Sequence, residues 1–415
     1  MKRRRFLLLA GAATLAGCAT PARAPKARVV VIGAGYGGAT VAKYVALWDP
    51  AIDVTVVERG SEFISCPISN LVLGGNRTMQ DITRGYDGLR KHGVRMVKAD
   101  ALAVDSGKRT VTLAGGATLA YDRLVLSPGV DFLYGEVAGY QGAEPRVLHA
   151  WKAGPQTVEL RRQLEAMPDG GVYLLTVPVA PYRCPPGPYE RACQVAHYFK
   201  RAKPRSKVLV LDANPDVTSK GPLFKRAWQE LYPGIIDYHA NAKVVAVDPA
   251  TMSVRTDFDT MKGDVLNVVP PQRAGDIALQ AGVITTANRW CDVDWRTMES
   301  KVVKGVHVLG DATLSASGMP KSGHMANAHA KVCAAALVEL LNGREPNPSP
   351  LMNNTCYSFV SDREVIHVAS VHQYDATQNT ILPVKGAGGV SAARSELEGA
   401  YAWSWARNIW ADMFA

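Results

Sequence analysis

The sequence predicts an α/β fold in which two Rossmann-like nucleotide-binding domains are followed by a C-terminal interface domain. Three observations predict it. An apolar, β-branched run at residues 28–32 is followed at once by closely spaced glycines. A second such run occupies residues 171–176, and a third, at residues 305–309, leads directly into Gly-Asp. Short apolar runs that alternate with helical patterns are typical of buried parallel strands in α/β domains.

The size and composition agree with this class. The chain has 415 residues, which is too long for one compact core and predicts two or three domains. Hydrophobic residues make up 47% and charged residues 20%, values typical of a globular chain. Half of the net charge of +10 comes from residues 1–24, which contain no acid. No later basic run and no interleaving of aromatic with basic residues follows, so we exclude nucleic-acid binding.

The first 24 residues have the pattern of an export signal. A basic head at residues 2–5 precedes a short apolar stretch at residues 6–17, and Arg-Arg-Arg-Phe-Leu resembles a twin-arginine signal. We therefore expect a periplasmic protein. The stretch is shorter than the roughly 20 residues that span a bilayer, and we expect no transmembrane span elsewhere. Two processing sites stay open, namely cleavage after Ala24 or a lipoprotein signal that places a lipid on Cys18.

The first nucleotide-binding unit begins with the strand predicted at residues 28–32. A helix is predicted over residues 39–47, and a second strand over residues 54–57. This strand ends at Glu58, where an acid can accept hydrogen bonds from a ribose. We count Glu58 and the adjacent Arg59 among the cofactor-binding candidates.

Three glycines between the strand and the helix have different predicted roles. Gly33 permits the tight turn, Gly35 lets the backbone approach a pyrophosphate, and Gly38 lets helix and strand pack closely. The free N–H groups at the helix start would then bind the phosphates. Strand, glycines, helix, second strand and acid together predict binding of an adenine dinucleotide.

Two later patterns favour FAD over NAD as this dinucleotide. The strand predicted at residues 305–309 ends in Gly310-Asp311, and enzymes of the glutathione-reductase superfamily use such an Asp to bind the ribityl chain of FAD. Residues 121–129 resemble the other marker of these enzymes, a strand that closes in small residues near the domain exchange. Asp311 is therefore a further cofactor-binding candidate.

The second unit departs from the first where it would bind a nucleotide. After the strand at residues 171–176, the loop at residues 177–188 holds five prolines where a nicotinamide enzyme has glycines. Proline lacks the N–H group that a pyrophosphate needs. We expect this unit to keep the fold, with its next strand at residues 208–212, but to have lost NAD(P)H.

These patterns divide the chain into five expected segments. They are an export signal (1–24), the first part of the FAD-binding domain (25–137), a second, NAD-like domain that lacks a nicotinamide site (138–267), the second part of the FAD-binding domain (268–345) and a C-terminal interface domain (346–415). In the last segment, Tyr401, Trp405 and Ile409 share one helical face. An aromatic stripe of this kind is typical of a core or a subunit interface.

Several irregular stretches resemble one family, the flavoprotein subunit of flavocytochrome c sulfide dehydrogenase. The resemblance extends from about Lys26 to Phe414. The stretches are Cys184-Pro-Pro-Gly-Pro-Tyr-Glu-Arg-Ala192, Pro270-Pro-Gln-Arg-Ala-Gly275, Gly310-Asp-Ala312, Met319-Pro-Lys-Ser-Gly323 and Asn354-Thr-Cys-Tyr-Ser358. The sulfide:quinone oxidoreductases are similar in plan but more distant.

The resemblance implies roles for individual residues. Cys184 and Cys356 match the redox-active disulfide over the flavin, and Cys66 matches the cysteine that binds FAD covalently through a thioether. The residue after Cys66 is proline, where we would expect an aromatic residue. Glu190 matches an acid near the disulfide, and Trp405 matches an aromatic residue close to the flavin.

The implied chemistry is attack of hydrosulfide on the Cys184–Cys356 bond, which leaves a persulfide on one cysteine and a thiolate on the other. We expect the persulfide on Cys184 and the thiolate on Cys356, next to the flavin. A basic residue near the pyrimidine edge would stabilise the flavin anion, and Lys321, at a predicted helix start, is the candidate.

Each role has a structural alternative. Cys184 and Cys356 could form an ordinary stabilising disulfide, and Cys66 could be a buried free thiol. Glu190 could pair with Arg191 or Arg183 and not act as a proton acceptor. We expect Cys193, Cys291 and Cys333 to be buried and inert, and no metal site, because no Cys-x-x-Cys pair or His cluster accompanies the cysteines.

The resemblance implies sulfide as substrate and a c-type cytochrome subunit as partner in a heterodimer. The haem would lie on that partner, because this sequence contains no Cys-x-x-Cys-His motif. A sulfide:quinone-type enzyme and a non-enzymatic flavoprotein of sulfur oxidation are the alternatives. The proline loop argues against a fourth possibility, an NADH-dependent disulfide reductase.

Overall fold

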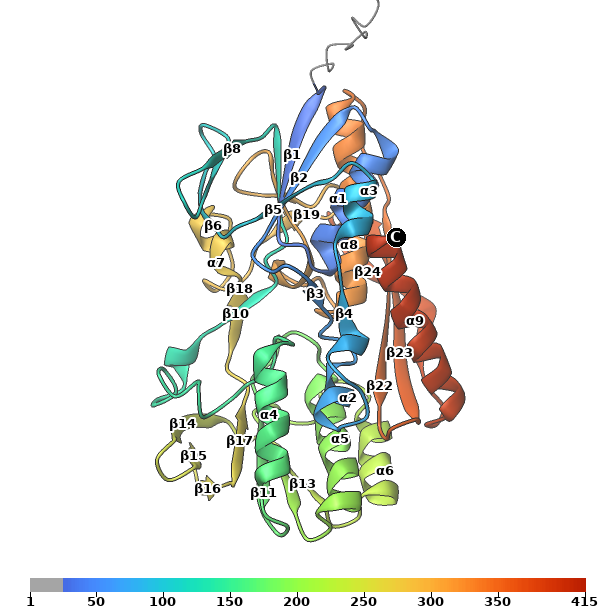
Figure 1. Cartoon of the computed structure of the whole chain (residues 1–415). Coiled ribbons are helices and arrows are strands. Elements are labelled where there is room, and N and C mark those ends of the chain that lie inside the picture. Colours follow the sequence, from blue (N-terminus) through green and yellow to red (C-terminus); the bar gives the residue numbers. More distant parts are fainter. Residues whose placement is uncertain (1–24) are drawn as a thin grey trace, which may run out of the picture.

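The computed structural model describes residues 25–415. The expected export signal and Cys18 therefore lie outside the described residues. Two α/β bodies lie one above the other, and a C-terminal sheet and helix run along one side of both (Figure 1). The predicted α/β class with Rossmann-like units is confirmed, while the five segment boundaries remain predictions.

The first body is built on a seven-stranded sheet assembled from distant parts of the chain. Its central strand β1 pairs in parallel with β2 and with β9, and β9 pairs in parallel with β21. The late Gly-Asp strand therefore lies beside the first half of the domain. In sheet order, the strands are β19 (Val293–Asp294), β20 (Glu299–Ser300), β21 (Val306–Val308), β9 (Arg123–Leu126), β1 (Ala27–Ile32), β2 (Ile52–Glu58) and β5 (Arg95–Lys98).

Two long helices pack against each other on this sheet. Helix α1 (Tyr36–Trp48) follows the glycine turn, and helix α8 (Gly323–Leu341) follows the late strand. The Ser322 hydroxyl caps α8 by accepting a hydrogen bond of 3.0 Å from the Met325 N–H. Most of α1 is buried, so this helix forms the centre of the body and fixes the direction of the glycine turn.

The second body is a four-stranded parallel sheet of the same β-α-β type. Strands β11 and β12 pair in parallel, and helix α5 connects them. In sheet order, the strands are β13 (Ile236–His239), β12 (Lys207–Asp212), β11 (Val172–Val177) and β17 (Val265–Val268), and the helices are α4 (Pro155–Ala166), α5 (Gly187–Ala202) and α6 (Gly221–Leu231). Its core is separate from that of the first body.

A two-stranded antiparallel ribbon, β10 (Val130–Phe132) with β18 (Gln272–Ala274), lies where the chain passes between the bodies (Figure 1). The remaining short elements cover edges and loops. They are β3 (Phe63–Ile64), β4 (Thr83–Arg84), β6 (Ala101–Asp105), β7 (Thr110–Leu113), β8 (Thr118–Ala120), β14 (Val244–Asp248), β15 (Ser253–Thr256), β16 (Thr260–Lys262), α2 (Ser69–Leu73), α3 (Asp87–Lys91), α7 (Asp276–Gln280), η1 (Gln80–Ile82), η2 (Tyr134–Glu136) and η3 (Gly310–Ala312).

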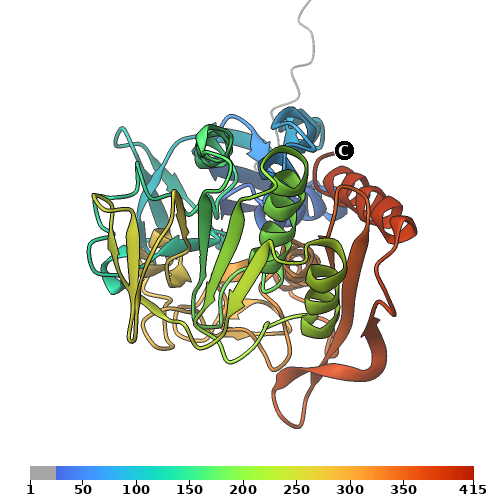
Figure 2. The same ribbon diagram turned by 90° about the horizontal axis from the view of Figure 1, so that it is seen from below.

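The C-terminal region is an antiparallel sheet of β22 (Leu351–Phe359), β23 (Val365–Asp375) and β24 (Thr380–Val390), followed by helix α9 (Glu396–Phe414) (Figure 2). On the predicted aromatic face of α9, Tyr401 is 51% exposed whereas Ile409 is buried. The buried face is shifted toward the helix end, where the rings of Phe414 and Phe63 lie 5.2 Å apart. The helix thus closes against the first body.

Candidate functional site

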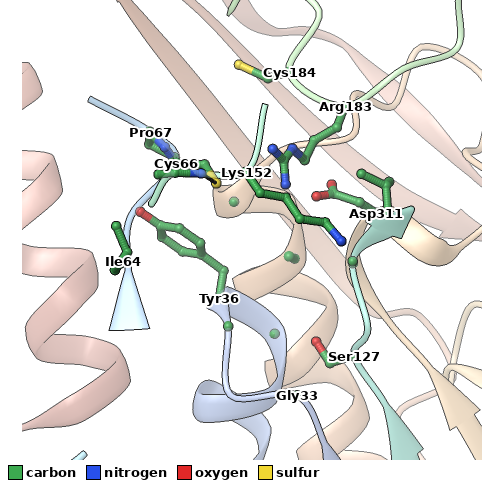
Figure 3. A pocket seen from close by; sticks show the side chains of 18 of the residues that line it. Gly33, Tyr36, Ile64, Cys66, Pro67, Ser127, Lys152, Arg183, Cys184 and Asp311 are labelled. Carbon is green, nitrogen blue, oxygen red and sulfur yellow. Dashed lines mark hydrogen bonds between the residues drawn. The ribbon is translucent and has the colours of Figure 1, made fainter. Parts of the chain in front are cut away.

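A cavity of about 520 Å³ lies where the two bodies and the C-terminal region meet. Its walls include the glycine turn of the first body, the proline loop of the second and the strand β22. Figure 3 shows the side chains of Cys66, Arg183 and Asp311 directed into the same space, above the turn at Gly33. Side chains from segments far apart in the sequence therefore share one site.

The glycine turn has the shape that a pyrophosphate requires. Gly33 has φ +92°, and a Cβ atom there would lie 2.4 Å from the Ser127 carbonyl oxygen. A Cβ atom on Gly38 would lie 1.7 Å from the Gly33 carbonyl oxygen, whereas one on Gly35 would meet no atom within 4 Å. The turn is therefore closed toward the sheet and open toward the cavity, and α1 begins at its mouth.

Glu58 ends β2 at the rim of the cavity. Its carboxylate accepts hydrogen bonds from the N–H groups of Ala34, at 2.7 Å, and Gly60, at 2.9 Å. These two donors hold the carboxylate beside the glycine turn, as ribose binding would require. Arg59 also lines the cavity, but its side chain is 78% exposed and pairs with Asp100 at 3.1 Å.

Asp311 supplies a polar group that has no partner. The residue follows β21 and lines the cavity, and its Oδ1 atom is buried without a hydrogen bond to any residue of the range 25–415. Burial raises the pKa of this carboxyl, while Arg183 and Lys321 act in the opposite direction. A buried acceptor of this kind is costly unless something binds it. The orphaned oxygen, the open turn at Gly35 and the position of Glu58 together fit FAD.

Lys321, the candidate for the pyrimidine edge of the flavin, is held by its neighbours. Its Nζ atom donates hydrogen bonds to the carbonyl oxygens of Asp311 and Thr313 and lies 3.7 Å from the centre of the Trp290 ring. The side chain is buried outside the lining of the cavity. Local packing directs the ammonium toward the backbone and an indole, and the expected role at the pyrimidine edge stays a prediction.

The cysteines fall into two groups. Cys66, Cys184 and Cys356 are partly exposed and line the cavity, whereas the predicted burial of the other three is confirmed. All six cysteines of the described range are free thiols, and the buried three are Cys193, Cys291 and Cys333. The structure thus brings together the three cysteines that the resemblance singled out.

The loop that carries Cys184 is fixed at both sides of that residue. The Cys184 N–H donates to the Lys321 carbonyl at 2.8 Å, and the Cys184 carbonyl accepts from the Gly187 N–H at 2.8 Å. A Cβ atom on Gly187 would lie 2.9 Å from the Cys184 sulfur. Burial raises the pKa of this thiol, and the neighbouring Cys356 and Glu190 raise it further. The glycine after the prolines therefore leaves room for the sulfur.

Cys356 lies on β22 across the cavity. The Nδ2 atom of Asn354 lies 3.5 Å from the Cys356 sulfur, within hydrogen-bonding range for sulfur. Burial raises the pKa of the Cys356 thiol, and the cation of Lys220 partly offsets this effect. Lys220 itself donates to the Cys356 carbonyl at 2.9 Å. Two different segments therefore place polar groups around Cys356: Asn354 contacts its sulfur, and Lys220 donates to its carbonyl.

Cys66 lies on the loop between β3 and α2. The Ala153 N–H points at its sulfur from 3.4 Å, and the Ser69 hydroxyl donates to its carbonyl at 2.6 Å. Pro67 follows it, and the carbonyl of Pro67 accepts a bond of 2.8 Å from Ser65. The loop therefore presents the Cys66 sulfur to the cavity, where it faces Arg183 (Figure 3).

Glu190 is buried and lies on the first turn of α5, at the cavity wall. It accepts hydrogen bonds of 2.8 Å from the Asn70 amide and from the Phe359 N–H. Burial raises the pKa of this carboxyl. The alternative of an ion pair is wrong, because no salt bridge joins Glu190 to Arg191 or Arg183 in the described structure. Arg191 instead donates to Asn70 and to backbone carbonyls.

Trp405 of α9 lines the cavity together with His324. Its indole N–H lies 3.3 Å from the Nδ1 atom of His324, which also accepts a bond of 2.9 Å from the Thr355 N–H. Burial lowers the pKa of His324. The C-terminal helix therefore contributes an aromatic wall that is held by the start of α8.

Sequence reasoning missed the positively charged residues Lys152 and Arg183, which line this cavity, and Lys220, which lies behind Cys356. Arg183 was part of the proline loop that we singled out, but nothing in its pattern indicated that its side chain enters the cavity. Lys220 lies before α6, outside every motif. In the range 25–415, no cluster of three metal-ligating side chains exists, and no helix is long and apolar enough to cross a membrane.

Three family models match successive parts of the chain. Residues 27–165 match pyridine nucleotide-disulphide oxidoreductase. Residues 157–270 match the central part of the sulfide dehydrogenase (flavocytochrome c) flavoprotein chain. Residues 348–414 match the flavin-binding part of flavocytochrome c sulphide dehydrogenase.

Comparisons with individual proteins agree with the family models. A flavoprotein chain of sulfide dehydrogenase (flavocytochrome c) from Chlorobaculum thiosulfatiphilum is 56% identical over 45 residues, which are 11% of this chain and 94% of that sequence. Mitochondrial sulfide:quinone oxidoreductase of Mus musculus is 24% identical over 301 residues, 69% of this chain, and the match spans 65% of the mouse protein, just under two thirds.

A solved structure shares the fold. The sulfide:quinone oxidoreductase of Aquifex aeolicus superposes with a TM-score of 0.75 at 20% identity, covering 93% of this chain and 91% of that one. Together, the two family-specific models and the Chlorobaculum sequence show that the chain belongs to the flavoprotein chains of flavocytochrome c sulfide dehydrogenase, a family of sulfide-oxidising flavoprotein oxidoreductases.

Proposed function

We propose that the chain binds FAD, oxidises sulfide through a redox-active Cys184–Cys356 disulfide and passes the electrons to a c-type cytochrome subunit in the periplasm. The observation that carries the proposal is the meeting of Cys184 and Cys356 in the cavity that also holds the glycine turn and Asp311. A purely structural disulfide does not need the free cavity volume that both residues line.

The first step is a thiol–disulfide exchange. Hydrosulfide attacks the sulfur of Cys184, a new S–S bond forms, and the Cys184–Cys356 bond breaks. The electron pair of the broken bond moves to the sulfur of Cys356, which becomes a thiolate. Cys184 keeps the persulfide and its proton. The sulfide sulfur is thereby oxidised to the level of a persulfide, and the Cys356 sulfur is reduced to a thiolate.

Glu190 is the proposed proton acceptor for hydrogen sulfide. Its carboxylate is buried at the wall of the cavity, and burial raises its pKa, which brings a carboxyl closer to the pH at which it can exchange protons. The Asn70 amide and the Phe359 N–H hold both oxygens in place. Proton removal by Glu190 would yield the hydrosulfide that attacks Cys184.

FAD would lie with its pyrophosphate on the turn at Gly33 and Gly35, its adenosine ribose at Glu58 and its ribityl chain at Asp311. When bound, FAD supplies a two-electron acceptor that can release electrons singly. We also propose that Cys66 binds it covalently through a thioether. A denatured sample that keeps its flavin colour, and loses it in Cys66→Ser, would support the bond.

The flavocytochrome c family name motivates the cytochrome partner, and the names of the mouse and Aquifex relatives favour a second candidate, a sulfide:quinone-type enzyme. Sulfide oxidation with a c-type cytochrome as acceptor, without turnover of decylubiquinone, selects the first. The reverse pattern selects the second. Export by the signal at residues 1–24, with or without a lipid on Cys18, belongs to the same proposal.

Anaerobic titration with sulfide tests the cysteine mechanism. The wild-type flavin spectrum should bleach rapidly, and Cys356→Ser should lose this rapid phase. Cys193→Ser is the matched control, since Cys193 is fully buried on α5, where it packs against the Trp228 indole N–H at 3.2 Å. Equal bleaching rates in all three proteins would contradict the mechanism. Slow bleaching of the wild type would favour a non-enzymatic accessory.

A further inference from the structure

Lys220 is a buried lysine in direct contact with the Cys356 residue. It precedes α6 with φ +58°, and it is 7% exposed. Its Nζ atom donates to the Cys356 carbonyl at 2.9 Å, to the Ser358 hydroxyl at 2.8 Å and to the Ile366 carbonyl at 3.3 Å. All three acceptors are neutral, and no carboxylate in residues 25–415 lies within salt-bridge distance of it. A buried ammonium without a counter-ion is costly.

The two sulfurs of the pair lie in unequal surroundings. The Cys356 sulfur is within reach of the Asn354 amide at 3.5 Å, and Lys220 binds the carbonyl of the same residue. The Cys184 sulfur has no hydrogen-bond donor among the described residues, since the bonds of Cys184 involve only its backbone groups. A negative charge on Cys356 is therefore better supported than one on Cys184.

We propose that Lys220 makes Cys356, and not Cys184, the sulfur that leaves as a thiolate when hydrosulfide attacks the pair. This inference rests on the proposed function. In that exchange, the negative charge of hydrosulfide moves to the sulfur of Cys356, the residue whose carbonyl the buried ammonium binds. A thiol of lower pKa leaves faster, so the cation directs attack to Cys184. The new thiolate also supplies the counter-ion that Lys220 lacks.

The other charged groups near the pair do not remove this asymmetry. Glu190, on α5, raises the pKa of both thiols. Arg183, on the preceding loop, and to a smaller extent Lys220 lower the pKa of Cys184, whereas Lys220 is the main cation that lowers the pKa of Cys356. The positive charge of Arg183 also acts on Cys66 and Asp311, so it does not act on Cys184 alone. Glu398, on α9, faces Lys220 from farther away. Burial lowers the pKa of Lys220 to about 8, against the opposing effects of Cys356 and Glu190. The ammonium is therefore present at pH 7.

A purely structural role for Lys220 is the competing explanation. The residue connects the start of α6 to β22 and β23, so its removal would lower the melting temperature in either case. Only the electrostatic role changes which sulfur ionises first. Ser358→Ala removes one acceptor of the same connection and keeps the ammonium, which makes it the matched control.

The experiment is limited alkylation of the reduced, flavin-containing full-length protein with iodoacetamide between pH 6 and pH 9, followed by peptide mass spectrometry. In the wild type, we expect Cys356 to react before Cys184 at pH 7. In Lys220→Met, the preference should fall about tenfold, which corresponds to about one pKa unit. Ser358→Ala should keep the wild-type preference even if its melting temperature falls.

Two results would overturn the inference. One is faster alkylation of Cys184 in the wild type, a measurement that needs no variant to fold. The other is an unchanged preference in Lys220→Met. A thiol count of the oxidised protein separates these failures from a failure of the proposed function. If Cys184 and Cys356 pair on oxidation, only the role of Lys220 is lost; if they stay free, both proposals fall.

Discussion

The two β-α-β units of this chain share a topology and use it in opposite ways. In the first, the turn between β1 and α1 is made of glycines and opens toward a cavity. In the second, the loop between β11 and α5 is rich in proline, and the rings of Tyr182 and Tyr189 are fully buried behind it. One turn exposes backbone N–H groups to the cavity, and the other places a cysteine at the wall of the same cavity.

The acids that end the second strand of each unit show the same contrast. Glu58 lines the cavity, where its carboxylate is held by two backbone N–H groups. Asp212 is completely buried and accepts hydrogen bonds from the hydroxyls of Tyr189, at 2.7 Å, and Tyr238, at 2.9 Å. The position that would bind a ribose is thus part of the core in the second unit, in line with our prediction that this unit binds no nicotinamide nucleotide.

The largest effect should come from the glycine turn. In Gly38→Ala, the new methyl group would lie 1.7 Å from the Gly33 carbonyl, so α1 must move away from β1. We expect nearly complete loss of bound flavin, measured as the ratio of flavin to protein absorbance. Gly135→Ala, at an exposed site where a Cβ meets nothing within 4 Å, is the control. A flavin-loaded Gly38→Ala protein would contradict the assignment of this turn.

The acids provide the next test. Asp212→Ala removes the carboxylate that accepts from the hydroxyls of the buried Tyr189 and the half-buried Tyr238, so the free energy of unfolding should fall by about 2–5 kcal/mol. Glu58→Ala removes a group at the rim of the cavity and should weaken flavin retention more than the stability of the flavin-free protein. Urea unfolding and flavin content of both variants separate the two roles. Equal losses of flavin in Asp212→Ala and Glu58→Ala would contradict the difference that we infer between the two acids.

Lowering the pH should reduce the stability of both bodies to unfolding, because buried histidines must take up protons. Burial lowers the pKa of His149, beside the second body, and of His329, on α8, to about 3 each. Between that pH and about 6.5, the unfolded chain binds more protons than the folded one, so stability is lost as the pH falls. The slope is at most about 1.4 kcal/mol per pH unit for each histidine. Urea unfolding at pH 7 and pH 5 should show a smaller loss in His149→Gln and in His329→Gln. An unchanged pH dependence in both variants would indicate that other groups cause the acid sensitivity.

The smallest expected effect is that of NADH. The second unit holds prolines where a pyrophosphate needs N–H groups, and its terminal acid is occupied by tyrosines. Stopped-flow mixing of the oxidised protein with NADH should therefore leave the flavin absorbance unchanged over seconds. Rapid bleaching would mean that the second unit still binds a nicotinamide nucleotide. This result would contradict the difference that we infer between the two β-α-β units.

Local patterns predicted the fold well and the site in part. The elements from β1 to β2 follow from apolar runs and glycine spacing, because the residues involved are neighbours in the sequence. The approach of Cys184 to Cys356 depends on the packing of two bodies and a third sheet, so only the family resemblance indicated it. The direction of Lys321 depends on Trp290, and the place of Lys220 on β22 and β23. No local pattern contains these contacts.

The indole of Trp405 at the cavity wall has a practical consequence. Its emission would be quenched by energy transfer to a flavin ring nearby, and the quenching would change when the ring is reduced. With FAD bound as proposed, the emission of Trp405 would report cofactor loading and redox state without an added label.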